Sequence, residues 1–307
     1  SLLKEGHNVV GIVRRSAMED KKLENIEHLL KDQHLTIENG DLTDCSSIWR
    51  IIQDYKPHKF YNLAAQSHVG ASFTSPESTT QINATGVLHC LEAIRNLSPQ
   101  TRFYQASTSE MYGDNPAVPQ NESTTLSPNS PYAVAKVYAH NLVANYRMAY
   151  GLFACSGILF NHESERRGEQ FVTRKITKAA ARIKLGLQTG LSLGNLDARR
   201  DWGYAPEYVE GMKAILRHDI ADDYVLATGE THTIRQFIDY VSEAAGFNLM
   251  DYVSVSQSNM RPSEVPLLLG DPSKAKRVLG WEAKIKAKDL ATIMYNADLQ
   301  KEQKDVR

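Results

Sequence analysis

The chain has few cysteines, no long apolar run and almost no net charge, and each absence excludes a class of protein. The three cysteines among 307 residues are isolated and odd in number, so we expect neither a disulfide framework nor a zinc site. No apolar run approaches the roughly 18 residues of a membrane-spanning helix, and no signal-peptide pattern opens the chain. A formal net charge of -1 gives no global field that would attract nucleic acid or an anionic membrane. We therefore expect a cytoplasmic globular protein that holds no metal and binds neither nucleic acid nor a membrane.

Short apolar runs alternate with longer helical patterns over the first half of the chain. Strands are predicted at residues 7–13, 35–41, 59–65, 103–108 and 153–160. Helices are predicted at residues 24–31, 45–55, 79–97 and 132–150. Strands that are separated by helices imply an α/β fold with a doubly wound parallel sheet, which is Rossmann-like. We predict such a nucleotide-binding domain over residues 1–160. A smaller, less regular and mainly substrate-binding region covers 161–307, with some segments returning to the first domain.

The beginning of the chain does not match the beginning of such a sheet. A dinucleotide-binding fold of this type starts with a strand and a glycine-rich turn whose backbone approaches the pyrophosphate. Residues 1–6 instead look like the end of a helix that Gly6 closes. Loss of a central strand would leave two strand edges unpaired, so we expect the sequence to be a fragment without its first strand and glycine loop. As written, the chain is expected to hold a pyrophosphate poorly.

Four side chains supply a complete set of proton-handling groups: Thr108, Glu110, Tyr132 and Lys136. Residues four apart share one face of a helix, so the Lys136 ammonium is expected beneath the Tyr132 phenol, where it favours the ionised form. A phenol of pKa ~10 becomes a usable base near neutrality only with such help. Thr108 offers a hydroxyl to hydrogen-bond the reacting alcohol. Glu110 adds a carboxylate that simple alcohol oxidation would not require.

The position of these residues favours a functional interpretation over an ordinary helix surface, where tyrosine and lysine often stand four apart. Ser130 and Pro131 form a helix-start signal directly before Tyr132, and the strand at 103–108 ends at Thr108. In open α/β sheets, ligands bind at the carboxyl ends of the strands. We therefore predict a catalytic site at this edge of the sheet.

Several strings of residues carry a family resemblance over residues 1 to about 281. The most specific are Asn-His-Glu-Ser at 161–164, Arg-Arg-Gly at 166–168 and Arg-Asp-Trp-Gly at 200–203. Others lie at 11–16, 40–44, 62–69, 107–113, 171–175 and 261–265. With them the chain resembles the extended short-chain dehydrogenases/reductases that act on nucleotide sugars, and most closely the GDP-mannose 4,6-dehydratases.

The cofactor is predicted to be NADP. Arg14 and Arg15 follow the strand at 7–13, where an arginine accommodates a 2′-phosphate and an acidic residue would accept the ribose hydroxyls of NAD. Two solvated loop arginines are the alternative. The resemblance implies further cofactor contacts at Asp41, Leu42, Leu63, Ala64, Ala65, Gln66, Ser67, Tyr132, Lys136, His162 and Arg167. Asp41 could equally form a turn, and residues 63–67 could equally be a buried strand end.

The resemblance implies GDP-mannose as the substrate. A diphosphate needs cations, and Lys175, Arg200 and Arg261 lie in the second region, although each taken alone could be a surface charge. Asn161, Asn195 and Glu264 are the candidate hydrogen-bonding partners for the sugar or the guanine.

The reaction that the resemblance implies is that of a lyase in GDP-fucose biosynthesis, which converts GDP-mannose to GDP-4-keto-6-deoxymannose with internal hydride transfer through NADP. Glu110 separates this dehydration from epimerisation, because an epimerase needs no acid or base at C5 and C6. A related epimerase or reductase and a non-catalytic nucleotide-sugar binder are the alternatives. A homodimer or homotetramer is also implied, with contact through the helices at 79–97 and 132–150, although the same apolar faces would pack inside a monomer.

Overall fold

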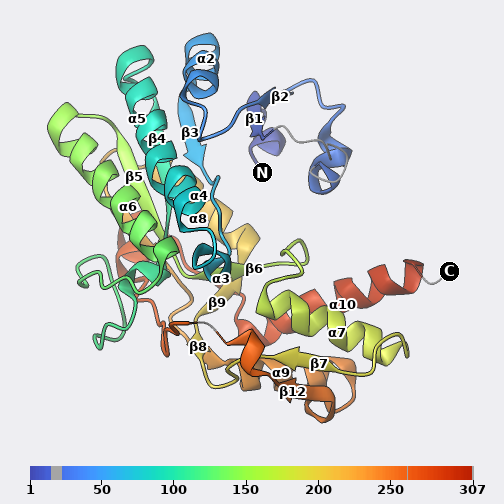
Figure 1. Ribbon diagram of the computed structural model, residues 1–307. Helices are drawn as coiled ribbons and strands as arrows, with labels where there is room; N and C mark the ends of the chain where they lie inside the picture. The colour runs from blue at the N-terminus through green and yellow to red at the C-terminus, as the bar shows by residue number, and fades with distance from the viewer. Residues whose placement is uncertain (15–22, 261, 306–307) are drawn as a thin grey trace.

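The main sheet of the protein is parallel and has the strand order β10-β5-β4-β3. These strands are β10 (Asp223–Leu226), β5 (Ala154–Leu159), β4 (Arg102–Thr108) and β3 (Lys59–Asn62). The computed structural model (Figure 1) describes residues 1–14, 23–260 and 262–305. The register sets Thr108 of β4 opposite Leu159 of β5, so both strands end at the same edge. The prediction of an α/β fold with a parallel sheet is confirmed.

Helices cover both faces of this sheet. On one face, α2 (Cys45–Tyr55), α5 (Gly86–Leu97) and α6 (Pro131–Tyr150) enclose an apolar cluster that includes Phe103 of β4. On the other face, α8 (Ala205–Arg217) packs against the next residue of the same strand, Tyr104. Because successive side chains of a strand point to opposite faces, a strand that is covered on both faces is buried along its whole length. All six residues of β5 are buried accordingly.

The first two strands form a small parallel sheet of their own, β1 (Val9–Val13) with β2 (Leu35–Asn39). In Figure 1 this sheet lies beyond the β3 edge of the main sheet, and among the described residues no strand pairs with both. The turn η1 (Leu2–Glu5) ends at Gly6, whose φ of 80° is the left-handed cap that was predicted. The helix predicted at 24–31 is a short 3₁₀ segment, η2 (Glu24–Leu29).

The single helix predicted at 79–97 is interrupted. It consists of α4 (Pro76–Thr80), a π-helical turn η3 (Gln81–Thr85) and α5, and the short helix α3 (Val69–Ser72) precedes it. Asn83, which is 1% exposed, lies in the wide turn. Its side chain donates to the carbonyl of Gln66 at 2.9 Å and accepts from the amide of Gln66 at 2.8 Å. Such π turns inside helices frequently occur at functional sites.

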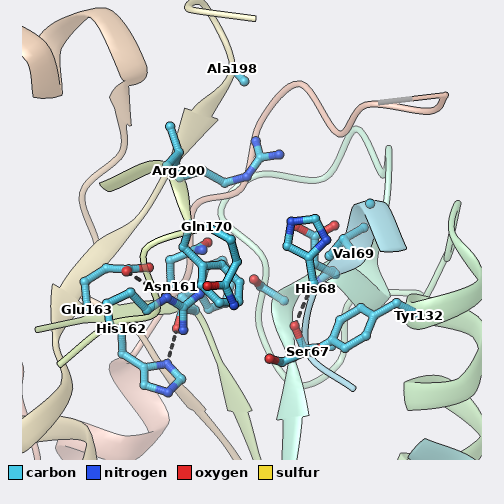
Figure 2. Close-up of a pocket in the computed structure, with 18 of the residues that line it drawn as sticks. Ser67, His68, Val69, Tyr132, Asn161, His162, Glu163, Gln170, Ala198 and Arg200 are labelled. Carbon is cyan, nitrogen blue, oxygen red and sulfur yellow. Dashed lines mark hydrogen bonds and ion pairs between the residues drawn. The ribbon is translucent and has the colours of Figure 1, made fainter. Parts of the chain in front are cut away.

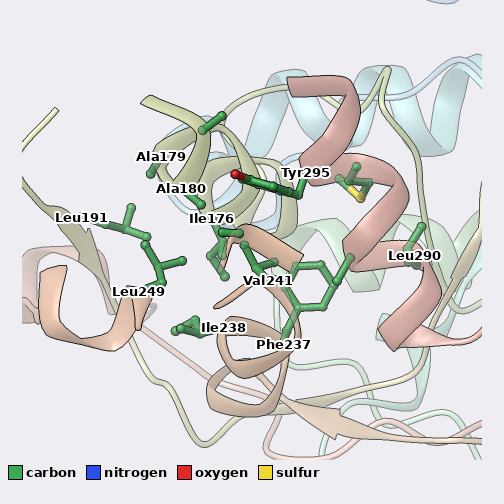
Figure 3. Close-up of a cluster of buried hydrophobic side chains, with 14 of the residues drawn as sticks. Ile176, Ala179, Ala180, Leu191, Phe237, Ile238, Val241, Leu249, Leu290 and Tyr295 are labelled. Atoms are coloured by element: carbon green, nitrogen blue, oxygen red, sulfur yellow. The ribbon is translucent and has the colours of Figure 1, made fainter. Parts of the chain in front are cut away.

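The second region has an apolar core of its own. The helices α7 (Val172–Lys184), α9 (Ile234–Ala245) and α10 (Ala287–Asp305) surround it, and Figure 3 shows Ile176, Phe237 and Leu290 converging there. The small strands pair as β7 (Leu191–Leu193) with β12 (Val253–Val255), β6 (Asn161–Glu163) with β9 (Trp202–Tyr204), and β8 (Arg199–Arg200) with β11 (His232–Thr233). The remaining turns are η4 (Ser109–Tyr112), η5 (Leu249–Tyr252), η6 (Gln257–Asn259) and η7 (Ala275–Leu279).

Two elements that follow residue 161 belong to the main sheet rather than to the second core. Strand β10 pairs with β5, and α8 packs on the sheet beside it. Asp223 at the start of β10 forms a two-bond ion pair with Arg147 of α6, with N···O distances of 3.0 and 2.8 Å. Among the described helices, none is long and apolar enough to cross a membrane.

Candidate active site

A cavity of about 820 Å³ opens at the carboxyl ends of β3, β4 and β5, where the main sheet meets the second region. This volume is typical of small-molecule sites. Its wall includes Thr108, Glu110, Tyr132 and Lys136, the four residues that were predicted to handle protons. The topology therefore brings the end of β4, with the turn that follows it, and the beginning of a helix to one cavity wall.

Thr108 and Glu110 reach the cavity through the turn that follows β4. Thr108 is the last residue of β4, and its Oγ1 accepts a hydrogen bond from the Glu110 amide at 3.3 Å. This bond caps η4 and turns the chain sharply after the strand. Both side chains are buried, at 9% and 8% exposed. A carboxylate and a hydroxyl are thus held beside each other with little access to bulk water.

Tyr132 and Lys136 lie on the first turns of α6. Ser130 caps this helix by accepting from the Ala133 amide at 3.1 Å, and Pro131 occupies the first helical position, so Tyr132 is fixed at the helix start. The Lys136 ammonium lies 5.9 Å from the centre of the Tyr132 ring and donates to the carbonyl of Ala106 at 2.8 Å. The two side chains share one face of the helix.

The electrostatics of this pair differ from the sequence prediction. Burial raises the pKa of Tyr132 to about 12; a hydrogen bond with Thr108 and the positive charge of Arg167 lower it, while the charge of Glu110 raises it. Burial also lowers the pKa of Lys136 to about 8. The net shift of the Tyr132 pKa is therefore upward, opposite to the lowering that was expected, and the help that Lys136 gives to the phenolate stays a prediction. Loss of water penalises both charged forms, and this loss outweighs the nearby charges.

Arg167 stands at the opposite wall of the cavity. Its Nε lies 3.1 Å from a carboxylate oxygen of the buried Glu163, and its guanidinium lies 3.6 Å from the centre of the Phe171 ring. The same oxygen of Glu163 accepts from the Thr173 hydroxyl at 2.7 Å. Figure 2 shows Asn161 and Glu163 on this wall, with Tyr132 across the cavity. The cavity thus has one wall of proton-handling groups and one wall that carries a fixed cation.

Comparison with known proteins identifies the family. The model of the GDP-mannose 4,6 dehydratase family matches residues 1–294. The chain belongs to this family.

Similar sequences of the family come from distant organisms. GDP-mannose 4,6 dehydratase 2 of Arabidopsis thaliana is 49% identical over 97% of this chain and 82% of its own length. The GDP-mannose 4,6-dehydratase of Sinorhizobium fredii is 49% identical over 97% of this chain and 91% of its own length. The corresponding Drosophila melanogaster protein is 45% identical over 97% of this chain and 82% of its own length. The predicted resemblance to GDP-mannose 4,6-dehydratases is confirmed.

Solved structures of lower identity share the fold. RMD from Pseudomonas aeruginosa, complexed with NADPH, superposes with a TM-score of 0.80 at 24% identity, covering 95% of this chain and 99% of that one. A dTDP-glucose 4,6-dehydratase from Bacillus anthracis, in complex with NAD, has a TM-score of 0.84 at 18% identity. The match covers 100% of this chain and 94% of that one. At this level of identity the likeness concerns the fold alone, and it confirms the Rossmann-like prediction.

The substrate residues predicted from the GDP-mannose 4,6-dehydratase resemblance gather at the cavity where the structure describes them. Those that line it are Asn161, Lys175, Asn195, Arg200 and Glu264. Arg200, 6% exposed, donates to the carbonyl of Val265 at 2.7 Å and pairs with Glu264 at 2.9 Å. Lys175 donates to the carbonyl of Ser192 at 2.8 Å. Arg261 lies outside the described residues.

The predicted cofactor residues of this family are more dispersed. Leu63, Ala65 and Ser67 line the cavity, as do His162 and Arg167, whereas Ala64 and Gln66 do not. Gln66 is tied through its backbone to Asn83.

The predicted cofactor residues that come before β3 in the sequence do not line the cavity where the structure describes them. Leu42, 7% exposed, packs in the core under α5. Asp41 accepts from the amide and hydroxyl of Thr43 at 2.9 and 2.8 Å, which is the turn-forming geometry that was the alternative. Arg14 directly follows β1 and does not line this cavity. Arg15 lies outside the described residues.

His162 is held as a neutral side chain. Its Nδ1 donates to the carbonyl of Phe160 at 2.9 Å, and its ring stacks on the buried Tyr208 with a centroid distance of 5.1 Å. Burial lowers its pKa to about 4, so the imidazole is uncharged near neutrality. The ring therefore supplies shape and a polar edge to the cavity wall, but no charge.

His68, Phe171 and Glu163 were not among the predicted site residues, yet all three line the cavity. His68 caps the start of α3, where its Nδ1 accepts from the Ala71 amide at 3.0 Å, and its ring lies 5.8 Å from that of Phe171. All three occur within strings that carried the family resemblance. Those strings were the signal that could have found them. Among the described residues, no group of three or more histidine, cysteine or acidic side chains could hold a metal ion.

Proposed function

We propose that the chain is an NADP-dependent GDP-mannose 4,6-dehydratase, which converts GDP-mannose to GDP-4-keto-6-deoxymannose. The observation that carries this proposal is that Glu110 lies beside Thr108 and opens on the same cavity as Tyr132. Oxidation of an alcohol needs the tyrosine and the hydroxyl, and elimination of water needs the additional carboxylate. Three relatives that bear the dehydratase name at 45–49% identity support the assignment.

The residues beyond β3 fit a nicotinamide nucleotide. Leu63 is apolar and yet 54% exposed, and it lines the cavity together with the small Ala65 and the hydroxyl of Ser67. An apolar surface next to a small residue suits the flat ring and its ribose. When bound, the nucleotide would supply a hydride acceptor for oxidation of the sugar and a hydride donor for its later reduction. The RMD structure with NADPH and the dTDP-glucose 4,6-dehydratase structure with NAD both support a nicotinamide cofactor. Arg14, which follows β1, favours NADP, because an arginine at this position accommodates a 2′-phosphate.

Tyr132 would accept the proton of the C4 hydroxyl, and Thr108 would orient that hydroxyl. The resulting C4 ketone acidifies the proton at C5. Glu110 would take the C5 proton and deliver it to the departing C6 hydroxyl, which leaves as water. Reduction at C6 would then require a proton at C5, and the proton that Tyr132 took from the C4 hydroxyl would balance it. General acid–base groups of this kind typically contribute ~10²–10⁴-fold each. Because burial raises the pKa of Tyr132 to about 12, the positive charge of Arg167 is one of the groups that would support the phenolate.

The second region would hold the nucleotide half of the substrate. Lys175 and Arg200 are cations on the cavity wall, and a diphosphate is best bound by such groups. Asn161, Asn195 and Glu264 would hydrogen-bond the sugar or the guanine.

The test is to incubate the protein with GDP-mannose and NADP⁺ and to read the product by mass. Two proteins are compared: the 307-residue chain, and the same chain with a β-strand and a glycine-rich turn fused ahead of Ser1. If the sugar nucleotide loses one water, the result supports the dehydratase. If this product forms with the fused protein but not with the 307-residue chain, the result also supports the expected role of the glycine loop. A product that keeps its C6 hydroxyl would identify an epimerase or reductase. Binding of GDP-mannose without any product, in both proteins, would leave a nucleotide-sugar binder.

We also propose that the protein forms a homodimer or homotetramer through α5 and α6. Four apolar or aromatic side chains of α6 are exposed, namely Val134 at 55%, Tyr138 at 47%, Met148 at 77% and Tyr150 at 53%. Val134 and Tyr138 stand four residues apart and share one helix face. Sedimentation of Val134→Glu should show smaller particles than sedimentation of the parent protein. An unchanged particle size would contradict this contact.

A further inference from the structure

The last helix of the chain carries a buried carboxylate that is fully engaged by α7. Asp298 of α10 accepts from Nε of Arg174 at 2.7 Å through Oδ1 and from the Thr177 hydroxyl at 2.7 Å through Oδ2. The Asp298 and Arg174 side chains are 1% and 7% exposed. A buried ion pair is weak evidence for stability, because the cost of removing both charges from water often exceeds their attraction. A reason other than folding stability is therefore needed for this pair.

The far end of Arg174 binds the turn that connects β6 to α7. Its Nη1 donates to the backbone carbonyls of Glu165 and Arg167, the latter at 3.1 Å. Within this turn, the Arg167 amide donates to the carbonyl of Ser164 at 3.0 Å. One guanidinium thus joins α10 to two carbonyls of a surface turn. A planar fork with five N–H donors is suited to such simultaneous contacts, and a lysine is not.

The turn presents Arg167 to the cavity. The Arg167 side chain is held on one side by Glu163 and on the other by the ring of Phe171. Its charge also acts on Tyr132 across the cavity, where it lowers the pKa of the phenol. A displacement of the turn would therefore move the fixed cation of the site.

We propose that Asp298 and Arg174 are positioning residues, which hold the turn at 164–168 so that Arg167 faces the nucleotide in the cavity. This inference rests on the proposed function in one respect, namely that the cavity binds a nicotinamide nucleotide. The proposal gives α10 a role in the site. Asp298 of this helix is 124 positions from Arg174 in the sequence and does not line the cavity.

The decisive variant replaces the pair by apolar residues of similar size, Arg174→Met with Asp298→Leu. Such replacements are often neutral or stabilising for folding, while the two donors to the turn are lost. We expect the thermal midpoint to be kept. We expect the amides of Arg167 and Phe171 to exchange with solvent about tenfold faster, and NADPH to bind about tenfold more weakly to the fused protein described above. A lost hydrogen bond from a charged donor, worth about 1.5 kcal/mol, corresponds to that factor.

The matched control lies on the same two helices. Arg182 pairs with Glu302 at 2.7 Å and also donates to the carbonyl of Leu187, and neither partner belongs to the turn. The double variant Arg182→Met with Glu302→Gln should leave both the exchange of the turn and the NADPH affinity unchanged. If this control shows the same tenfold effects as the Arg174–Asp298 variant, the pair acts only through helix packing and the proposal is overturned.

Two further proteins keep the proposal testable if the apolar pair folds poorly. Arg174→Lys keeps a charge beside Asp298 but cannot reach two carbonyls, so the turn should still exchange faster. Arg167→Ala should weaken NADPH binding by itself, and adding the apolar pair to it should change the affinity less than twofold, because the pair acts through Arg167. Unchanged exchange and NADPH affinity in both Arg174 variants, or additive losses in the Arg167→Ala background, would refute the positioning role.

Hydrogen exchange and NADPH titration require no turnover, so the two proposals can fail separately. If dehydration is absent but exchange and affinity respond as expected, the proposed function fails and the positioning role stands. If dehydration occurs and the Arg174 variants bind NADPH normally, the positioning role fails and the proposed function stands.

Discussion

Tyr132 and Lys136 are both nearly dehydrated, and for each side chain the loss of water outweighs the charges around it. Their spacing in the sequence correctly places them on one helix face. The spacing contains no information about the depth at which that face lies. Depth is set by Ala106 and the end of β4, which are distant in sequence, so the direction of both pKa shifts could not be predicted from the residues alone.

The charge on Lys136 should make the folded protein less stable than a neutral residue would. The shift of its pKa from 10.5 to about 8 corresponds to a cost of about 3 kcal/mol for the charged form. The unfolded chain binds this proton more tightly, so the cost is complete below pH ~8 and disappears as the pH rises toward 10.5. The lost hydrogen bond to Ala106 offsets about 1 kcal/mol of the gain. Lys136→Met should therefore unfold at a higher temperature than the parent near pH 7.

Calorimetry of both proteins near pH 7 and near pH 10 measures this effect. The difference in midpoint should shrink at the higher pH, because the parent no longer carries the buried charge. A variant that is less stable than the parent near pH 7 would show that the Lys136 ammonium is stabilised by its surroundings. The same substitution should abolish turnover if Lys136 belongs to the catalytic set.

Glu110→Gln should separate oxidation from elimination. Tyr132 would still take the C4 proton, but no carboxylate would remove the proton at C5, so loss of water should slow by ~10²–10⁴-fold. Reduced nicotinamide should then accumulate when the fused protein meets GDP-mannose and NADP⁺, and its near-ultraviolet absorbance reports this directly. Tyr132→Phe is the control, since it should produce neither absorbance nor product. Normal turnover by Glu110→Gln would remove Glu110 from the mechanism.

At the scale of elements, local periodicity was sufficient for the strands and insufficient for two helices, because the helix predicted at 24–31 is a 3₁₀ segment and the one at 79–97 is interrupted. The five predicted strands all occur, with ends shifted by up to three residues. The helix at 79–97 is interrupted by the π turn at which Asn83 reaches Gln66, 17 residues earlier. A side chain that must bond the backbone of another segment can displace the helical register. Such a contact is invisible to a count of apolar spacing.

Gly113 ends the η4 turn that carries Glu110, and we expect it to tolerate no side chain. Its φ of 56° and ψ of -135° lie in a region that other residues rarely adopt, and a Cβ would stand 1.7 Å from the carbonyl oxygen of Ser127. Relief requires the backbone before Ser130 and Tyr132 to shift. Gly113→Ala should thus lower the free energy of unfolding by about 3 kcal/mol and reduce turnover.

Gly151→Ala is the matched control for this substitution. Gly151 also has a positive φ, 67°, but a Cβ at this position would meet no atom within 4 Å. It should lose only about 1 kcal/mol, the cost of the left-handed backbone. Urea unfolding of both variants measures the difference. Equal losses would mean that Gly113 matters for its backbone angle and not for the approach of Ser127.

At the scale of the whole molecule, the sequence could predict which residues lie near the carboxyl ends of the strands. It could not predict the contacts between segments that are distant in the sequence. Parallel strands bring Thr108 and the residues after β3 to one edge, whichever helices follow. Asp298 contributes through Arg174, 124 residues away, and β10 enters the sheet from beyond the irregular region. Neither has a local signature, because each is defined only by its partner. The predicted division at residue 160, with some later segments returning to the first domain, stays a prediction, and β10 and α8 are two later segments that pack on the main sheet.

The two regions should unfold together, because β10 and α8 tie the second region into the main sheet. Trp49 reports on α2 beside that sheet, Trp281 on the cluster between α8 and the sheet, and Trp202 on the core of the second region. Two variants are needed, one that keeps only Trp49 and one that lacks only Trp49. Within each variant, the urea midpoint measured by fluorescence should equal the midpoint measured by circular dichroism. Fluorescence and circular dichroism midpoints that differ within either variant would indicate two independent units.

The ion pair between Asp223 and Arg147 tests the cause of this coupling. Both side chains are largely buried, at 15% and 19% exposed, and Asp223 also accepts from the Ser156 amide at 2.9 Å. Removal of one partner leaves a buried charge without its counter-ion, which costs about 3 kcal/mol or more. Asp223→Ala, introduced into both tryptophan variants, should lower the two fluorescence midpoints by similar amounts, because the lost contact belongs to one cooperative unit. A lower midpoint for Trp202 and Trp281 with an unchanged midpoint for Trp49 would mean that β10 unfolds from the sheet without disrupting it.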